Sequence, residues 1–183
     1  MLAFRLPLCL MHTAVKVNVD AGGLRIGLAV SRYHQEITDA MRDAAVETFR
    51  RCGGNQADLS IVPAAGTFEL TAVCSALARS ETGAGRPAFD ALVAVGCIIT
   101  GQTTHDQYIA QSVTQGLTAI TIETGVPIAF GVLTCQNLEQ ARHRSIEAAS
   151  NGRTNKGEEA MIAAIETART VQRLERRRRG MAR

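Results

Sequence analysis

The order of apolar and polar stretches along the chain predicts an alternation of strands and helices. Four short, mostly apolar runs bounded by glycine, proline or polar residues have the length and flanks of buried strands: 25–31, 58–62, 89–99 and 128–134. A further short strand is predicted over 119–123. The run 89–99 is nearly all apolar, so we expect it to be central and covered on both faces. Strands that alternate with helices predict a parallel, right-handed α/β sheet.

Apolar residues three and four positions apart mark the helices between these strands. Thr38 is placed to cap a helix that Gly53-Gly54 ends, and Pro63 is expected to stop the strand that follows. Further helices are predicted after the small-residue loop 64–67, and over 106–117, 137–149 and 158–177.

The composition predicts a single domain. With 183 residues, of which 46% are hydrophobic, the chain is long enough for one sizeable core and too short for two ordinary domains. Residues 1–24 lack a clear period and are expected to form a flexible arm. No run approaches the roughly 18 apolar residues of a membrane span, so no membrane contact is expected. Arg5, Pro7 and His12 interrupt the apolar opening stretch, which disfavours a signal peptide.

The formal net charge of +3 owes much to the end of the chain, where the stretch 173–183 holds six arginines. We expect a basic tail over 176–183. A nucleic-acid partner is not expected, because the basic residues are not spread over a face with base-stacking aromatics. A solvated helix end is the favoured interpretation, and a weak contact with a polyanion is the alternative.

The cysteines do not form a disulfide or zinc pattern. The chain has five cysteines, which are widely spaced and mostly set among apolar residues: Cys9, Cys52, Cys74, Cys97 and Cys135. Their odd number and their spacing fit neither a disulfide framework nor a zinc site. We therefore interpret them as reduced core cysteines of a cytoplasmic protein.

The stretch 96–108 holds a strand end, a polar turn and a helix start. Its Gly96-x4-Gly101-Gln102-Thr103 pattern imitates a nucleotide-binding phosphate loop, but Gln102 stands where that loop has lysine. Nucleotide hydrolysis is therefore not expected, whereas backbone N–H groups and threonine hydroxyls could hold a single phosphate. His105 has no second His or Cys at ligand spacing, so no metal is expected. It is a candidate general acid/base, and a helix cap is the equally weighted alternative.

Because the carboxyl ends of parallel strands share one edge, we expect the loops at 31–36, 64–69 and 100–105 and the segment 130–134 to converge there. Together they would bring an aromatic ring, a carboxylate, a histidine and phosphate donors to one rim. Such a rim suits a flat, polar small molecule that is neutral or anionic.

Several motifs in register resemble the 6,7-dimethyl-8-ribityllumazine synthase family. The resemblance covers residues 25–170 and rests on five stretches: 30–34, Gly66-Thr67-Phe68-Glu69, 96–108, 126–134 and Asn155-Lys156-Gly157, with Glu139-Gln140-Ala141 between the last two. It implies a three-layer α/β/α sandwich with a central four-stranded parallel sheet, a flavodoxin-like fold, over the domain 25–175.

The resemblance also implies an activity. Members of the family are transferases that condense 5-amino-6-(D-ribitylamino)uracil with 3,4-dihydroxy-2-butanone 4-phosphate in the penultimate step of riboflavin synthesis. Phosphate and water leave, and no metal or organic cofactor is required.

Carried over by position, the resemblance assigns roles to single residues. Tyr33 would stack on the pyrimidine ring, and His105 would shuttle protons. The remaining substrate-binding residues would be Thr67, Phe68 and Glu69 at the ribityl chain and ring edge, Ile98 and Ile99 beside them, Gly101, Gln102, Thr103 and Arg144 at the phosphate, and Phe130 and Lys156 from a neighbouring subunit.

The chain departs from the family pattern at a few positions. Thr100 stands where an arginine is common, Gln102 where a glutamate is common, and the loop between Pro63 and Gly66 is longer than in many members. The segment between Arg144 and Lys156 is also longer than in members that form icosahedral shells, so we expect a homopentamer with its active sites between subunits.

Two other functions stay open at this point. An archaeal-type riboflavin synthase shares the fold and would dismutate the lumazine, and a non-catalytic lumazine or flavin carrier would keep the rim without turnover. Supplying each substrate set to the purified protein separates the two enzymes. His105→Ala separates the enzyme from a carrier, since it should slow the condensation with little change in ligand binding.

Overall fold

The computed structural model of the chain describes residues 19–148, 150, 152 and 154–181. Strands and helices alternate as the sequence predicts. The elements are β1 (Ile26–Ser31), α1 (Gln35–Arg51), a short 3-10 helix η1 (Gln56–Asp58), β2 (Leu59–Ala64), α2 (Leu70–Ala78), β3 (Ala91–Ile99), α3 (His105–Thr124), β4 (Ile128–Cys135), α4 (Leu138–His143) and α5 (Lys156–Met181).

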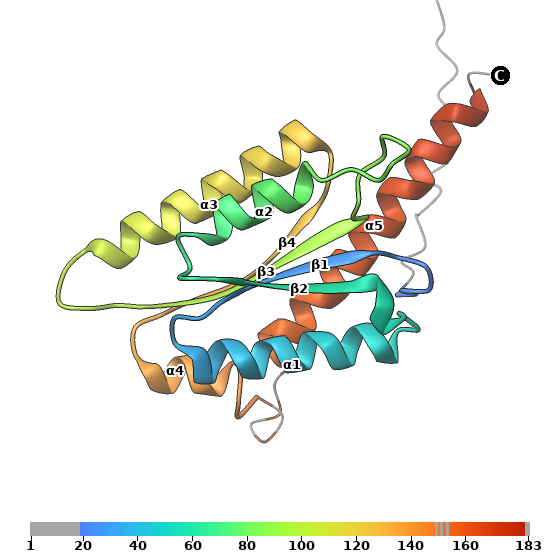
Figure 1. Ribbon diagram of the computed structural model, residues 1–183. Coiled ribbons are helices and arrows are strands. Elements are labelled where there is room, and N and C mark those ends of the chain that lie inside the picture. Colours follow the sequence, from blue (N-terminus) through green and yellow to red (C-terminus); the bar gives the residue numbers. More distant parts are fainter. Residues whose placement is uncertain (1–18, 149, 151, 153, 182–183) are drawn as a thin grey trace, which may run out of the picture.

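The four strands form one parallel sheet in the order β2-β1-β3-β4. Helices α1 and α5 cover one face of this sheet, and α2 and α3 cover the other (Figure 1). The predicted three-layer α/β/α fold with a four-stranded parallel sheet is therefore confirmed. As predicted, β3 is central, and every residue from Ala91 to Ile98 on it is buried.

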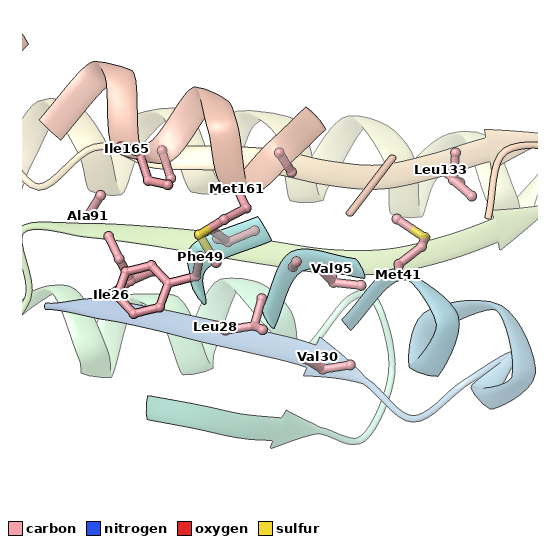
Figure 2. Packing of buried hydrophobic residues seen from close by; sticks show 14 of the residues in the cluster. Ile26, Leu28, Val30, Met41, Phe49, Ala91, Val95, Leu133, Met161 and Ile165 are labelled. Carbon is pink, nitrogen blue, oxygen red and sulfur yellow. The ribbon is translucent and has the colours of Figure 1, made fainter. Parts of the chain in front are cut away.

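The larger of two cores lies between the sheet and the pair α1 and α5 (Figure 2). This core contains Phe49 of α1, Met161 and Ile165 of α5, and Ile26 and Leu28 of β1, and all five side chains are at most 1% exposed. Full burial of a side chain of this size contributes about 1.5–3 kcal/mol. A second core joins α2 and α3 to the opposite face of the sheet.

Asn155 fixes the start of α5. Its side chain accepts a hydrogen bond from the Gly157 N–H at 2.7 Å and donates to the carbonyl oxygens of Ser145 at 2.8 Å and Ala40 at 3.3 Å. A Cβ atom at Gly157 would lie only 1.8 Å from the Met41 carbonyl oxygen, so only glycine permits the close approach of α5 to α1.

The predicted strand over 119–123 is wrong, because α3 continues through it to Thr124, where Gly125 ends the helix with φ 73°. The β-branched run Ile120-Thr121-Ile122 favours a strand in isolation. Four threonines on α3 donate their hydroxyls to the carbonyl four residues earlier: Thr114, Thr118, Thr121 and Thr124. Residues that usually favour strands are thus accommodated in a helix whose Val113, Leu117 and Ile120 face the core.

Other predicted boundaries also move. Strand β2 runs through Pro63 to Ala64, which is possible because β2 is an edge strand. The helix predicted over 137–149 ends at His143 and is followed by turns. Helix α1 begins at Gln35 instead of Thr38.

The expected flexible arm over 1–24 falls mostly on residues 1–18, outside the described part of the chain. Residues 20–24, at its end, pack on the folded body. Ala21 and Leu24 are fully buried, and the Ala21 N–H donates to the Cys52 carbonyl oxygen at 2.8 Å. At the other end, residues 176–181 of the expected basic tail continue α5 as helix.

Candidate active site

A cavity of about 980 Å³ opens at the carboxyl edge of the sheet, where the loops after β1, β2 and β3 meet the first turns of α3. The strand register brings these loops together, because Ser31 at the end of β1 pairs with Ala64 at the end of β2. The residues that line the cavity are Tyr33, His34, Gly66, Thr67, Phe68, Glu69, Cys97, Ile98, Ile99, Gly101, Thr103, His105, Asp106, Tyr108, Ile109, Gln111, Ser112 and Gln115.

The loop after β1 contributes an aromatic wall. The Ser31 hydroxyl accepts a hydrogen bond from the Tyr33 N–H at 3.2 Å, and the Tyr33 ring stays 66% exposed. The His34 ring packs edge-on against it, with ring centroids 4.7 Å apart and planes at 73°. This contact leaves much of the Tyr33 ring open to the cavity.

His34 itself has an unusual backbone. Its φ of 56° and ψ of 50° place it in the left-handed region, and it stands at the N-cap of α1. The His34 carbonyl oxygen accepts hydrogen bonds from the Ile37 and Thr38 N–H groups. Burial lowers the pKa of the His34 imidazole, which favours the neutral ring at neutral pH.

The loop after β2 contributes a buried hydroxyl, an aromatic ring and a carboxylate. Thr67 is 6% exposed, and its hydroxyl donates to the Cys97 carbonyl oxygen of β3 at 3.2 Å. A Cβ atom at Gly96 would come within 2.8 Å of the Thr67 methyl group, so glycine on β3 makes room for this loop. Phe68 and Glu69 are therefore held at the start of α2 with their side chains exposed.

The loop after β3 contributes the start of a long helix. Residues 101–104 are exposed, and α3 begins at His105. A helix N-terminus offers unpaired N–H groups and a partial positive charge, which suit an anion. The His105 imidazole makes no hydrogen bond to any described residue, and Thr104 holds the N-cap position, so nothing in this geometry supports His105 as a cap.

Four predicted site residues lie outside this cavity: Gln102, Phe130, Arg144 and Lys156. Gln102 belongs to the loop after β3 but does not line the cavity wall. Phe130 is 47% exposed on the edge strand β4. Arg144 and Lys156 lie next to each other, since the Lys156 N–H donates to the Arg144 carbonyl oxygen at 3.0 Å. The Lys156 ammonium pairs with Glu159.

The cavity also contains residues to which the sequence assigned no role. His34, Asp106 and Tyr108 line it, as do Gln111, Ser112 and Gln115 of α3. Periodicity could have found the α3 residues, because positions 105, 108, 112 and 115 share one helix face. Nothing in the pattern could have shown that this face looks into the cavity.

Other kinds of chemistry find little support at this edge. Burial, with a smaller contribution from Cys135, raises the pKa of the Cys97 thiol to about 12, so it stays protonated and a poor nucleophile. Within the described ranges no three His, Cys, Asp or Glu side chains gather as metal ligands. The same ranges hold no helix that is both long and apolar enough to cross a membrane.

A parallel α/β sandwich with a large cavity over the carboxyl ends of its strands is a small-molecule-binding protein of the α/β class. The family model described as 6,7-dimethyl-8-ribityllumazine synthase matches residues 23–172. The chain belongs to this family, so the predicted family and its enzyme class are confirmed.

Individual relatives carry the same name as the family model. A protein named 6,7-dimethyl-8-ribityllumazine synthase from Streptomyces coelicolor is 42% identical over 83% of this chain and 88% of its own length. Proteins of the same name from Corynebacterium efficiens and Lawsonia intracellularis are 41% and 34% identical, over 85% and 87% of this chain and 89% and 96% of their own lengths.

Proposed function

We propose that this chain condenses 5-amino-6-(D-ribitylamino)uracil with 3,4-dihydroxy-2-butanone 4-phosphate to form 6,7-dimethyl-8-ribityllumazine, releasing phosphate and water. One observation carries the proposal for this member of the family. Residues from three separate loops, among them Tyr33, Thr67 and His105, line a single cavity large enough for both substrates.

The uracil end of the cavity is its aromatic part. We assign Tyr33 to stacking on the pyrimidine ring, because its exposed face looks into the cavity. Thr67, Phe68 and Glu69 hold the ribityl chain and the ring edge, with the hydroxyl and carboxylate as hydrogen-bonding groups. Ile98 and Ile99 at the end of β3 supply the apolar floor.

The phosphate end is the loop after β3. Gly101, Gln102 and Thr103 offer N–H groups and a hydroxyl in front of α3, whose dipole favours an anion there. Arg144, which lies outside the cavity of its own chain and next to Lys156, supplies from a neighbouring subunit the cation that this loop lacks, since Gln102 and Thr100 are neutral.

His105 transfers the protons. Addition of the 5-amino group to the ketone and loss of water give an imine, and phosphate is then eliminated. The ribitylamino nitrogen attacks the remaining carbonyl carbon, and loss of a second water completes the lumazine ring. Each step moves a proton near neutral pH, the range in which imidazole can both donate and accept. His105 lines the same cavity as Tyr33, Thr67 and Gly101, which supports a role for its imidazole in these steps.

We also propose that the chain forms a homopentamer with its sites between subunits. Phe130, Arg144 and Lys156 lie outside the cavity of their own chain, and the exposure of Phe130 on an edge strand leaves it available to a neighbour. We further propose a cytoplasmic location. The free thiols of Cys52, Cys74, Cys97 and Cys135 support it, since such thiols persist in a reducing compartment.

Lumazine formation from the two substrates tests the proposed function. We expect His105→Ala to slow the catalysed reaction by about tenfold or more while substrate binding changes little. The uncatalysed condensation must be subtracted, and Gln107→Ala is a matched control because Gln107 is an exposed α3 residue that does not line the cavity. Equal rates for His105→Ala and the parent would remove His105 from the mechanism. Turnover of lumazine alone would favour a riboflavin synthase, and tight binding without turnover a carrier.

A further inference from the structure

The loop between β3 and α3 is held by few contacts. At its first end, the Thr100 N–H donates to the Cys135 carbonyl oxygen of β4 at 2.9 Å. At its other end, the Gln107 N–H donates to the Thr104 carbonyl oxygen within the start of the helix. In the described part of the chain no hydrogen bond restrains Gly101, Gln102 or Thr103, whose groups the proposed phosphate site uses.

One side-chain contact spans this loop. The Thr100 hydroxyl donates to the Asp106 Oδ2 atom at 3.0 Å, joining the end of β3 to the first turn of α3. The second carboxylate oxygen, Oδ1, is buried and has no partner among the described residues. Asp106 is therefore fixed in the cavity wall and differs from a freely solvated carboxylate at a helix start.

The charge of Asp106 makes this position unexpected. A carboxylate beside a phosphate site repels the phosphate, and the loop itself has no cation to offset that repulsion. The helix dipole favours the carboxylate at the N-terminus of α3, but it favours the phosphate there as well. For Asp106 to favour phosphate binding overall, it has to act through a group that it holds in place. Among the described residues that group is the Thr100 hydroxyl.

We propose that Asp106 is a positioning residue for the phosphate end of the substrate, which it serves through its bond to Thr100. This hydrogen bond between Thr100 and Asp106, which we call the clamp, sets the spacing between the end of β3 and the start of α3. The N–H groups of residues 101–103 are therefore arranged before the substrate arrives. Binding then orders less of the loop, and preorganisation of this kind improves affinity without contact to the ligand. The inference rests on the proposed function, because it concerns the phosphate end of that site.

Four single variants separate the clamp from the charge. Asp106→Ala and Thr100→Val remove the bond from either side, whereas Asp106→Asn keeps an acceptor without the charge and Thr100→Ser keeps the hydroxyl. Gln107→Ala is the control on the neighbouring position. The readouts are the KM for the butanone phosphate, the KM for the ribitylaminouracil, kcat, and the inhibition constant of inorganic phosphate.

The clamp predicts a selective effect. Asp106→Ala and Thr100→Val should each raise the KM for the butanone phosphate and the inhibition constant of inorganic phosphate about three- to tenfold, the range of one lost hydrogen bond. The uracil KM and kcat should stay within about twofold. A variant that combines Asp106→Ala with Thr100→Val should be no worse than Asp106→Ala alone. Asp106→Asn should bind phosphate at least as tightly as the parent, because it keeps the acceptor and removes the repelling charge, and Thr100→Ser should stay near the parent.

Two outcomes would overturn the clamp. One is tighter phosphate binding in both Asp106→Asn and Asp106→Ala, which would make Asp106 only a repulsive charge. The other is unchanged phosphate binding in Thr100→Val. If Asp106→Ala does not fold, the Thr100→Val and Thr100→Ser pair decides alone. Calorimetric titration with inorganic phosphate gives the same comparison without turnover, so failure of the clamp and failure of the proposed function remain distinguishable.

Discussion

At the scale of single residues, His34 connects the fold to the aromatic wall of the cavity. It begins α1 from a left-handed backbone and packs its ring against Tyr33. Residues other than glycine are uncommon in that conformation, although histidine, asparagine and aspartate adopt it more often than the rest, and such backbone strain is typical of functional sites. Composition and periodicity could not predict this role, because neither reports a backbone angle.

The lowered pKa of His34 predicts a pH dependence of stability. In the unfolded chain the imidazole has its usual pKa of about 6.5, whereas burial lowers the pKa in the folded chain. The unfolded chain therefore binds more protons as the pH falls below 6.5. The stability that depends on neutral His34 is complete above that pH and is lost as the pH falls through the lowered pKa.

His34→Asn tests this dependence, because asparagine tolerates the left-handed backbone and does not titrate. Denaturant unfolding at pH 7.5 and pH 5 should show a smaller loss of unfolding free energy in the variant than in the parent. The other histidines are common to both proteins and cancel in the comparison. An equal loss in the two proteins would show that His34 does not contribute.

At the scale of the elements, the sequence best predicted the strands and helices that are equally buried along their whole length. Strand β3 is buried along nearly its whole length, so its apolar run was sufficient to place it. The stretch 119–123 predicts a strand because Ile120, Thr121 and Ile122 favour strands in isolation, whereas packing on the sheet makes it the end of α3. The loops after β1, β2 and β3 line one cavity, as parallel topology predicts, whereas no residue of the segment 130–134 lines it.

The contact between α1 and α5 gives a stability prediction. Gly157→Ala would place a Cβ atom against the Met41 carbonyl oxygen, and the backbone cannot yield as a side-chain tip could. We expect a loss of at least about 2 kcal/mol in the free energy of unfolding, measured by denaturant titration.

Gly83→Ala is the matched control for this substitution, because a Cβ atom there would meet nothing within 4 Å. Its stability should change by less than about 0.5 kcal/mol. If Gly157→Ala and Gly83→Ala behaved alike, the close approach of α5 to α1 would be refuted.

At the scale of the whole molecule, the single chain holds only part of the proposed site. Tyr33, Thr67 and His105 come together within one cavity, whereas Arg144 and Lys156 form a separate pair near the start of α5. The resemblance assigned Phe130 and Lys156 to a neighbouring subunit, and no property of one sequence or one chain could place them against the cavity. The central claim is therefore a lumazine-forming site that two subunits share.

Mixed subunits test this claim most directly. His105→Ala and Lys156→Ala chains carrying different tags are co-expressed, assemblies with both tags are purified, and light scattering checks that their mass is that of five 19.6-kDa chains. If a site takes His105 from one subunit and Lys156 from its neighbour, about a quarter of the sites in an equal random mixture carry both native residues. We predict lumazine formation near a quarter of the parent rate, far above either variant alone. A mixed assembly no more active than the average of the two variants would contradict a site shared between subunits.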